Sequence, residues 1–120
     1  MSYVLIVEDD KRMAESLAMM VKVFGWESRF AHSVLGAVRQ AHQEKPALIF
    51  LDLHMPNMDG MDVLTYVKHD ESTKDTAVVI VTAEDSFESM QRAREGGAMA
   101  YLIKPVTMDQ IEDILKQIPR

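Results

Sequence analysis

Polar residues able to take part in phosphoryl chemistry stand directly after four short apolar runs of this chain. They are Glu8 and Asp9 after the first run, Asp52 after the second, Thr82 after the third and Lys104 after the fourth. The carboxyl ends of parallel strands meet at one edge of a sheet, where open α/β folds bind their ligands. If each run is a strand of one parallel sheet, these side chains are expected to form a single site.

Three of these residues are acids, and this limits what the site could bind. Carboxylates at close range do not all stay ionised unless another group compensates their charge. A divalent cation such as Mg²⁺ compensates them, because it takes carboxylate oxygens together with waters and phosphate oxygens. A flavin or nucleotide loop would instead offer amides and hydroxyls to a phosphate, whereas Glu8, Asp9 and Asp10 would repel one. We therefore expect Mg²⁺, or Mn²⁺, at this edge.

Next to a bound cation, the carboxylate of Asp52 could attack a phosphoryl group and form an aspartyl-phosphate. Such a transfer depends mostly on positioning and on neutralising the phosphoryl oxygens. The Lys104 ammonium and the Thr82 hydroxyl are suitable for two of these oxygens.

Each residue alone also has a simpler interpretation. Asp9 or Asp10 could cap the helix that follows, Thr82 with Asp85 resembles a loose capping box, and Lys104 could be a solvated loop lysine. The functional interpretation rests on four strand ends carrying suitable residues in a consistent order. The four histidines are scattered without the helical spacing of a zinc site.

The elements that would position these residues alternate between strands and helices. Apolar runs predict strands at 3–7, 47–52, 77–81 and 98–103, and the mixed segment 26–31 predicts an exposed edge strand. Helical spacing predicts helices ending at Gly25, from Ser33 to about 43, from 61 to 69, from about 86 to 95 and from Thr107 onward. Pro56 and Asp59-Gly60 predict a turn after the central strand.

Five such units predict an α/β fold, a doubly wound (βα)5 arrangement of the flavodoxin type with a parallel five-stranded sheet in the order 2-1-3-4-5. The helix at 86–95 has a thin apolar face made of Phe87, Met90 and Ala93, which is typical of an element that can move. No repeat or linker is visible, so residues 1–120 are expected to form one domain.

Composition narrows the function classes. The chain has 120 residues, 48% of them hydrophobic, and a net charge of −6, which disfavours binding to nucleic acid because that affinity comes mostly from Lys and Arg. No apolar run reaches the roughly 20 residues of a membrane span, and the N-terminus lacks the pattern of a signal peptide. Without cysteine there are no disulfides or thiolate metal sites. A cytoplasmic protein that contacts neither membrane nor nucleic acid is expected.

These motifs together resemble the receiver domain of bacterial two-component response regulators, over essentially the whole chain. The matching stretches are Leu5–Asp10, Leu51–Gly60, Val81–Glu84 and Tyr101–Pro105. The stretch Met55–Gly60 is similar to the corresponding segment of the chemotaxis response regulator.

The resemblance implies a phosphorylatable signalling switch rather than a turnover enzyme. Asp52 would accept phosphate from a sensor histidine kinase or a phosphotransfer protein. Mg²⁺ would be held by Asp9, Asp52 and the backbone carbonyl of His54, with Glu8 acting through water. Thr82 and Lys104 would contact the phosphoryl group, and the Lys104–Pro105 bond would be cis.

In this family the threonine moves inward on activation and an aromatic residue, here Tyr101, becomes buried. This change repacks the surface formed by the fourth helix, the last strand and the last helix, which would signal to an output domain or a downstream protein and could form a homodimer. His54 and Glu84 flank the site and would tune the lifetime of the phosphate.

Two alternatives remain at this stage. A phosphatase that forms an aspartyl-phosphate on a similar sheet usually carries a second aspartate two residues after the nucleophile, where this chain has His54. A degenerate receiver would act only as a binding module, but Glu8, Asp9, Asp52, Thr82 and Lys104 are all present.

Overall fold

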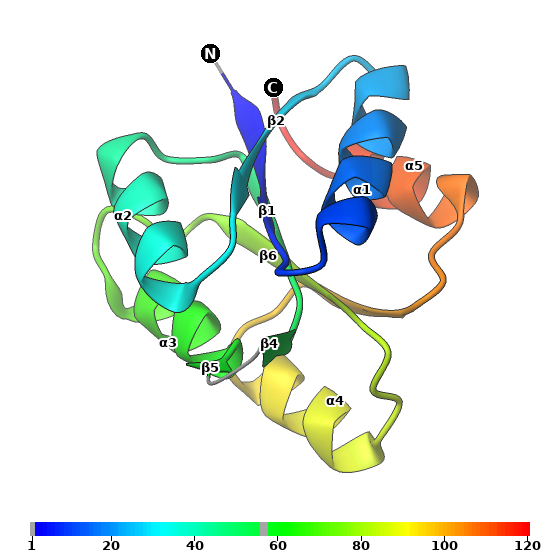
Figure 1. Ribbon diagram of the computed structural model, residues 1–120. Coiled ribbons are helices and arrows are strands. Elements are labelled where there is room, and N and C mark those ends of the chain that lie inside the picture. The colour runs from blue at the N-terminus through cyan, green and yellow to red at the C-terminus, as the bar shows by residue number, and fades with distance from the viewer. Residues whose placement is uncertain (1, 56–57) are drawn as a thin grey trace.

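The computed structural model describes residues 2–55 and 58–120 and shows a parallel sheet with helices on both faces (Figure 1). Its strands are β1 (Tyr3–Val7), β2 (Glu27–Ala31), β3 (Leu48–Leu51), β6 (Ala77–Thr82) and β7 (Ala100–Ile103). Its helices are α1 (Lys11–Val23), α2 (Val34–Gln43), α3 (Met61–His69), α4 (Phe87–Glu95) and α5 (Met108–Lys116). A short antiparallel pair, β4 (His54–Met55) and β5 (Met58–Asp59), follows β3.

The sheet order is β2-β1-β3-β6-β7, and each of its four strand pairs is parallel. This confirms the predicted order 2-1-3-4-5 once the strands of this sheet are counted alone. The β4–β5 pair was not predicted, since two-residue strands carry no periodic pattern. The predicted turn at Pro56 lies outside the described residues.

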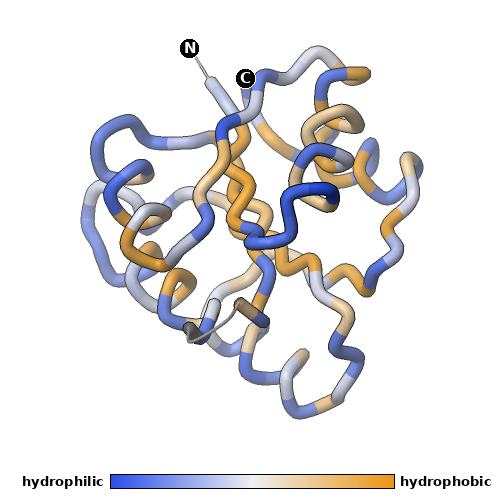
Figure 2. Tube along the Cα trace, in the orientation of Figure 1, coloured by the Kyte–Doolittle hydropathy of each residue, from blue (hydrophilic) through white to orange (hydrophobic). Residues whose placement is uncertain are grey.

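The alternation of side chains along each strand divides the core into two layers. Ile49 and Leu51 of β3 pack toward α2, α3 and α4, while Leu48 and Phe50 pack toward α1 and α5. Figure 2 shows the resulting hydrophobic centre, with hydrophilic residues mainly on the outer turns and helices. Burial on both faces explains why the inner strands are continuous apolar runs.

The helix ends follow the predicted signals with one correction. Ser33 caps α2, Thr107 caps α5 in a capping box, and Gly25 has a positive φ of 83° at the end of α1. Ser86 caps α4 through the Ser89 N–H, so the suggested capping role of Thr82 with Asp85 is wrong. A serine directly before the helix has the extended backbone that a cap requires.

The α4 helix differs from its predicted inner face. Its buried residues are Ser89 and Ala93, whereas the Phe87 side chain is 78% exposed. Phe87 is the first residue of α4, directly after the Ser86 cap. The helix therefore presents even fewer apolar groups to the sheet than the spacing indicated.

Candidate functional site

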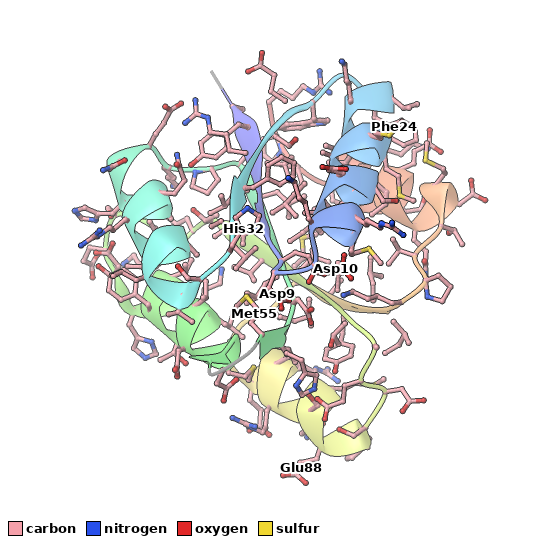
Figure 3. All side chains as sticks on the ribbon, viewed as in Figure 1. Asp9, Asp10, Phe24, His32, Met55 and Glu88 are labelled. Carbon is pink, nitrogen blue, oxygen red and sulfur yellow. The ribbon has the colours of Figure 1, made fainter. Side chains whose placement is uncertain are left out.

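The register of β1 and β3 brings the acidic residues together. Val7 lies opposite Leu51, and the Asp52 N–H donates to the Val7 carbonyl at 3.0 Å. Glu8 and Asp52, the residues that directly follow these two strands, therefore lie at the same edge of the sheet. Asp9 follows on the turn into α1, labelled with Asp10 in Figure 3.

One carboxylate oxygen from each of Glu8, Asp9 and Asp52 lies within 4.8 Å of the other two. Glu8 and Asp52 are buried, at 2% and 6% exposure, while Asp9 is exposed. The neighbouring Asp10 belongs to the helix instead, since its side chain accepts the N–H groups of Arg12 and Met13. The predicted cluster of three acids is thus present, and Asp10 rather than Asp9 is the helix cap.

Lys104 compensates part of this charge. Its ammonium nitrogen lies 2.6 Å from Glu8 Oε1 and 3.2 Å from Asp52 Oδ2, and the side chain is only 17% exposed. The peptide bond from Lys104 to Pro105 is cis, as expected. Lys104 was predicted to contact a phosphoryl group, and its ion pair with Glu8 was not foreseen.

Burial and the neighbouring charges shift the pKa values of Glu8 and Lys104. Burial raises the pKa of the Glu8 carboxyl to about 7, although Lys104 and the Asp10 N–H favour its ionised form and the negative Asp52 opposes it. Burial alone would lower the pKa of the Lys104 ammonium, but the hydrogen bond that it donates to Glu8 and the negative charge of Asp52 outweigh this effect, so this pKa is raised. Lys104 thus pairs with two of the three acids, so the group keeps negative charge that a bound cation would compensate.

The donor set fits a small divalent cation. Mg²⁺ takes oxygen ligands at about 2.0–2.1 Å, so two of its ligand oxygens lie about 2.9 Å apart when adjacent and about 4.2 Å apart when opposite. Carboxylate oxygens within 4.8 Å of one another approach this spacing, and the exposed side at Asp9 admits the waters that Mg²⁺ retains.

The Asp52 carboxylate is also held by its own loop. Its Oδ1 accepts the backbone N–H of His54 at 3.1 Å, while Oδ2 faces Lys104. The Gly60 N–H donates to the Leu53 carbonyl at 3.0 Å, which folds the β4–β5 segment back over the strand end. The carboxylate is therefore fixed from two sides before any ligand binds.

The sequence of the chain also matches a known protein family. Residues 4–116 match the family described as the response regulator receiver domain. The chain belongs to the response regulator receiver family.

Relatives and solved structures agree with this assignment. The polar-differentiation response regulator DivK of Brucella ovis is 30% identical over 113 residues, which cover 94% of this chain and 92% of that protein. The chemotaxis protein CheY4 of Vibrio cholerae has a structure similar to this one with a TM-score of 0.90, 25% identity and 99% coverage of both chains. A response regulator of Burkholderia pseudomallei, solved with a phosphorylated aspartic acid, a calcium ion and citrate, gives a TM-score of 0.87 and 26% identity over 98% of this chain and 68% of that chain.

The other predicted residues of this receiver domain lie around the acidic cluster. Thr82 is fully buried at the end of β6, and its hydroxyl oxygen accepts the Glu84 N–H at 3.4 Å. His54 Nε2 lies 3.1 Å from Glu84 Oε2, so the two predicted tuning residues form a bridge at the rim of the site. Hydrogen bonding from Ser89, together with His54, lowers the pKa of the Glu84 carboxyl.

Tyr101 lies half-buried on β7, and its hydroxyl donates to the Glu84 carbonyl at 2.8 Å and lies 3.2 Å from Ser89 Oγ. Ser89 was missed because a serine inside a polar helix has no distinguishing pattern. Its spacing of three residues from the Ser86 cap would place it on the inner side of the first turn, which is the one available sequence cue.

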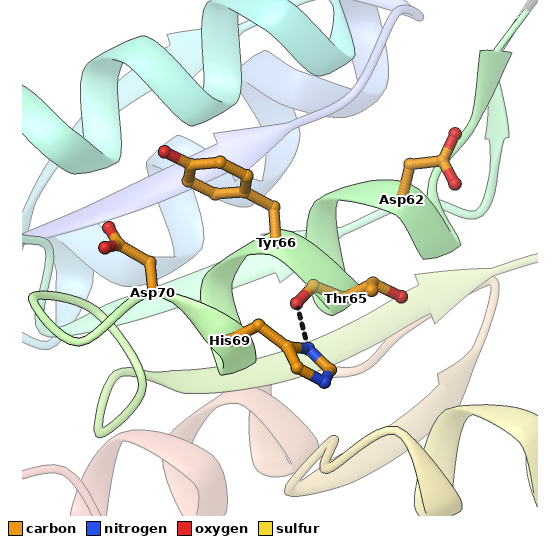
Figure 4. A pocket seen from close by; sticks show the side chains of 5 residues that line it. All are labelled: Asp62, Thr65, Tyr66, His69 and Asp70. Carbon is orange, nitrogen blue, oxygen red and sulfur yellow. Dashed lines mark hydrogen bonds between the residues drawn. The ribbon is translucent and has the colours of Figure 1, made fainter.

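A surface hollow of about 530 Å³ lies away from these strand ends, on α3 (Figure 4). It is lined by Asp62, Thr65, Tyr66, His69 and Asp70. His69 Nδ1 bonds the Thr65 carbonyl at 2.7 Å, and Asp70 accepts the Ser72 hydroxyl at 2.7 Å. His69 and Asp70 thus already have hydrogen-bond partners within the protein.

The described helices of this receiver domain are each too short or too polar to span a lipid bilayer.

Proposed function

We propose that Asp52 is the residue on which this receiver domain accepts a phosphoryl group from a histidine kinase or a phosphotransfer protein. The observation that carries the proposal is a buried carboxylate, 6% exposed, held between the Lys104 ammonium and the His54 N–H inside a group of three acids. In the transfer, an Asp52 oxygen forms a bond to phosphorus while the bond between phosphorus and the donor's imidazole nitrogen breaks. The electron pair of that broken bond remains on the donor nitrogen.

Glu8, Asp9 and Asp52 would hold Mg²⁺, with the His54 carbonyl as a further proposed ligand and Glu8 acting through a water. When bound, the ion neutralises negative charge that builds up on the phosphoryl oxygens. Lys104 already lies 3.2 Å from Asp52, so its ammonium is placed to pair with a second oxygen. The Thr82 hydroxyl would serve a third after leaving the Glu84 N–H.

The signal would leave through the surface of α4, β7 and α5. Tyr101 connects this surface to the site, because its hydroxyl donates a hydrogen bond to the backbone carbonyl of Glu84. The thin apolar contact of α4 supports movement there. An output domain, a downstream protein or a second copy of the chain is the proposed recipient.

Residues 1–120 would act as one receiver domain, located in the cytoplasm and binding neither membrane nor nucleic acid. It would catalyse only its own phosphorylation and dephosphorylation. Release of phosphate from a small phosphate ester over many turnovers would instead favour the phosphatase alternative.

The assignment of Asp52 is tested with a small phosphodonor such as acetyl phosphate in the presence of Mg²⁺. Intact-protein mass spectrometry should show one added phosphoryl group on the wild type and none on Asp52→Asn, which keeps the shape of the side chain but removes its nucleophilic charge. Asp113→Asn, an exposed acid on α5, is the matched control and should be phosphorylated normally. Phosphorylation of Asp52→Asn at the wild-type level would exclude Asp52 as the acceptor.

A further inference from the structure

The backbone N–H and the carbonyl of Glu8 are both hydrogen-bonded, one to the last residue of β2 and the other to the residue that follows it. The Glu8 N–H donates to the Ala31 carbonyl at 3.1 Å, and the Glu8 carbonyl oxygen lies 2.9 Å from His32 Nδ1. Val7 pairs with Ala31 in the sheet, so these two contacts lie at the carboxyl end of the β1–β2 pairing. Figure 3 labels His32 beside the end of β1, near the turn that carries Asp9.

The chemistry of the contact determines which nitrogen of His32 carries the proton. A carbonyl oxygen only accepts hydrogen bonds, so Nδ1 must donate. The ring is also stacked on Phe30, with centroids 6.2 Å apart and planes 18° apart. This contact gives a reason for Phe30, which is 42% exposed at the edge of the sheet, to be aromatic.

The bonded carbonyl belongs to the peptide group that joins Glu8 to Asp9. A peptide group is planar, so fixing its oxygen restricts the rotation of the whole unit from one Cα to the next. The two Cα atoms at its ends carry two of the three carboxylates of the acidic group. One imidazole N–H therefore helps to fix the backbone from which both carboxylate side chains extend.

We propose that His32 is a positioning residue for the metal site, and that it acts through the peptide between Glu8 and Asp9. This inference rests on the proposed Mg²⁺-dependent function. His32 does not ligate the ion; it presents Glu8 and Asp9 in a preformed arrangement. Groups that orient metal ligands commonly matter for affinity although they do not touch the metal.

A purely structural role for His32 makes a different prediction. Ser33 caps α2 through the Gly36 N–H independently of the imidazole, so the following helix does not need His32. A structural role would lower the free energy of unfolding and leave the Mg²⁺ affinity of the folded protein unchanged. A positioning role lowers the affinity in protein that remains folded.

The test compares three variants with the wild type. His32→Phe keeps a ring that can stack on Phe30 but lacks the N–H donor, whereas His32→Asn retains an N–H donor close to the position of Nδ1. His69→Phe is the matched control, because His69 Nδ1 makes the same kind of bond to a backbone carbonyl, that of Thr65, away from the strand ends. Mg²⁺ binding is measured by isothermal titration calorimetry on unphosphorylated protein.

His32→Phe is expected to weaken Mg²⁺ binding about tenfold, the lower end of the range for groups that orient ligands. His32→Asn should largely restore binding, and His69→Phe should leave it unchanged. In metal-free protein, hydrogen exchange at the Glu8 and Asp10 amides should be faster in His32→Phe than in the wild type, since both amides depend on the fixed peptide. This readout does not require the metal.

Wild-type Mg²⁺ affinity in folded His32→Phe would overturn the inference and leave the proposed function intact. Equal losses in His32→Phe and His69→Phe would also overturn it, because the effect would not depend on position. A wild-type protein that binds no Mg²⁺ would contradict the proposed function itself.

Discussion

At the residue scale, the candidate site buries charged groups that are costly to remove from water but whose types suit phosphoryl chemistry. Glu8 and Asp52 are buried acids that share one partly buried lysine, Lys104. Buried ion pairs of this kind contribute little net stability, because desolvation opposes the attraction. Burial also raises the pKa of Glu8 to about 7, so its charge is held at a cost to the folded protein. Such an arrangement is expected where function rather than stability selected the residues.

At the rim of the site, the His54–Glu84 bridge should influence how water reaches a phosphoryl group on Asp52. Asn at position 54 is too short to span the present 3.1 Å contact, so the bridge would open. We expect His54→Asn to accept phosphate but to lose it about two- to fivefold faster, the rate change that corresponds to the loss of one side-chain hydrogen bond. Decay of phosphoprotein after removal of the donor gives the rate.

Glu84→Gln is the companion variant for this measurement, because it keeps the length of the side chain and removes its negative charge. It should change the decay rate in the same direction with a smaller effect. An unchanged decay rate in His54→Asn would show that the bridge plays no part in phosphate lifetime.

At the scale of elements, the β4–β5 segment and the start of α3 bring Gly60 against the strand end. A Cβ atom on Gly60 would lie 2.3 Å from the Asp52 carbonyl oxygen and 2.8 Å from the Leu53 Cα. Both contacts are to backbone, which cannot move aside as a side chain can. The backbone at Gly60 is right-handed helical with a φ of −58°, which any residue can adopt. The close approach, and not the backbone conformation, therefore requires glycine at this position.

Gly60→Ala is expected to lower the free energy of unfolding by about 3 kcal/mol, the upper part of the range for overpacking. The same clash would displace the Asp52 backbone, so phosphorylation from a small donor should be slower as well. Urea denaturation followed by circular dichroism measures the first effect, and intact mass over time measures the second.

Gly36→Ala on α2 is the matched control, because the nearest atoms to its Cβ would be side-chain atoms, the Ser33 hydroxyl at 3.0 Å and the Ala31 Cβ at 4.0 Å, and no backbone atom. It should cost much less stability and leave phosphorylation unchanged. If the two variants were equally stable, the approach of Gly60 to the strand would have no energetic consequence.

At the scale of the whole molecule, the acidic group joins β1 to β3 across the centre of the sheet, with helices α1 and α5 on one face and α2, α3 and α4 on the other (Figure 1). Asp52 is far from Glu8 and Asp9 in the sequence, so unfolding would separate its carboxylate from theirs. A ligand that needs all of them therefore binds only the folded chain and stabilises it.

Mg²⁺ is expected to raise Tm, and a chelator should reverse the effect. At a concentration 100 times Kd the gain is about 2.7 kcal/mol, which corresponds to about 10 °C for a domain of this size. Differential scanning calorimetry over a Mg²⁺ series at constant ionic strength measures it.

Asp9→Asn removes one carboxylate of the group and should give a much smaller rise in Tm, whereas Asp113→Asn on α5 should respond like the wild type. A rise in Asp9→Asn as large as in the wild type would place the ion somewhere other than the acidic group.

The sequence by itself determined the strands of the five-stranded sheet, the helices that cover it, their order and the edge at which the site lies. Apolar runs, helical spacing and caps such as Ser33 and Thr107 are encoded in neighbouring residues, so they can be recognised without knowing the rest of the chain. The convergence of Glu8, Asp9 and Asp52 followed from parallel strands having a common carboxyl edge.

Only the tertiary structure decided how these side chains meet. The bond between Lys104 and Glu8 joins residues 96 positions apart, and it depends on rotamers and packing that no local pattern records. The outward position of Phe87, the approach of Gly60 to the Asp52 backbone and the bond from His32 to the Glu8 carbonyl have the same origin. Each is set by how closely separate elements pack, and a sequence pattern reports the period of an element but not the surface it meets.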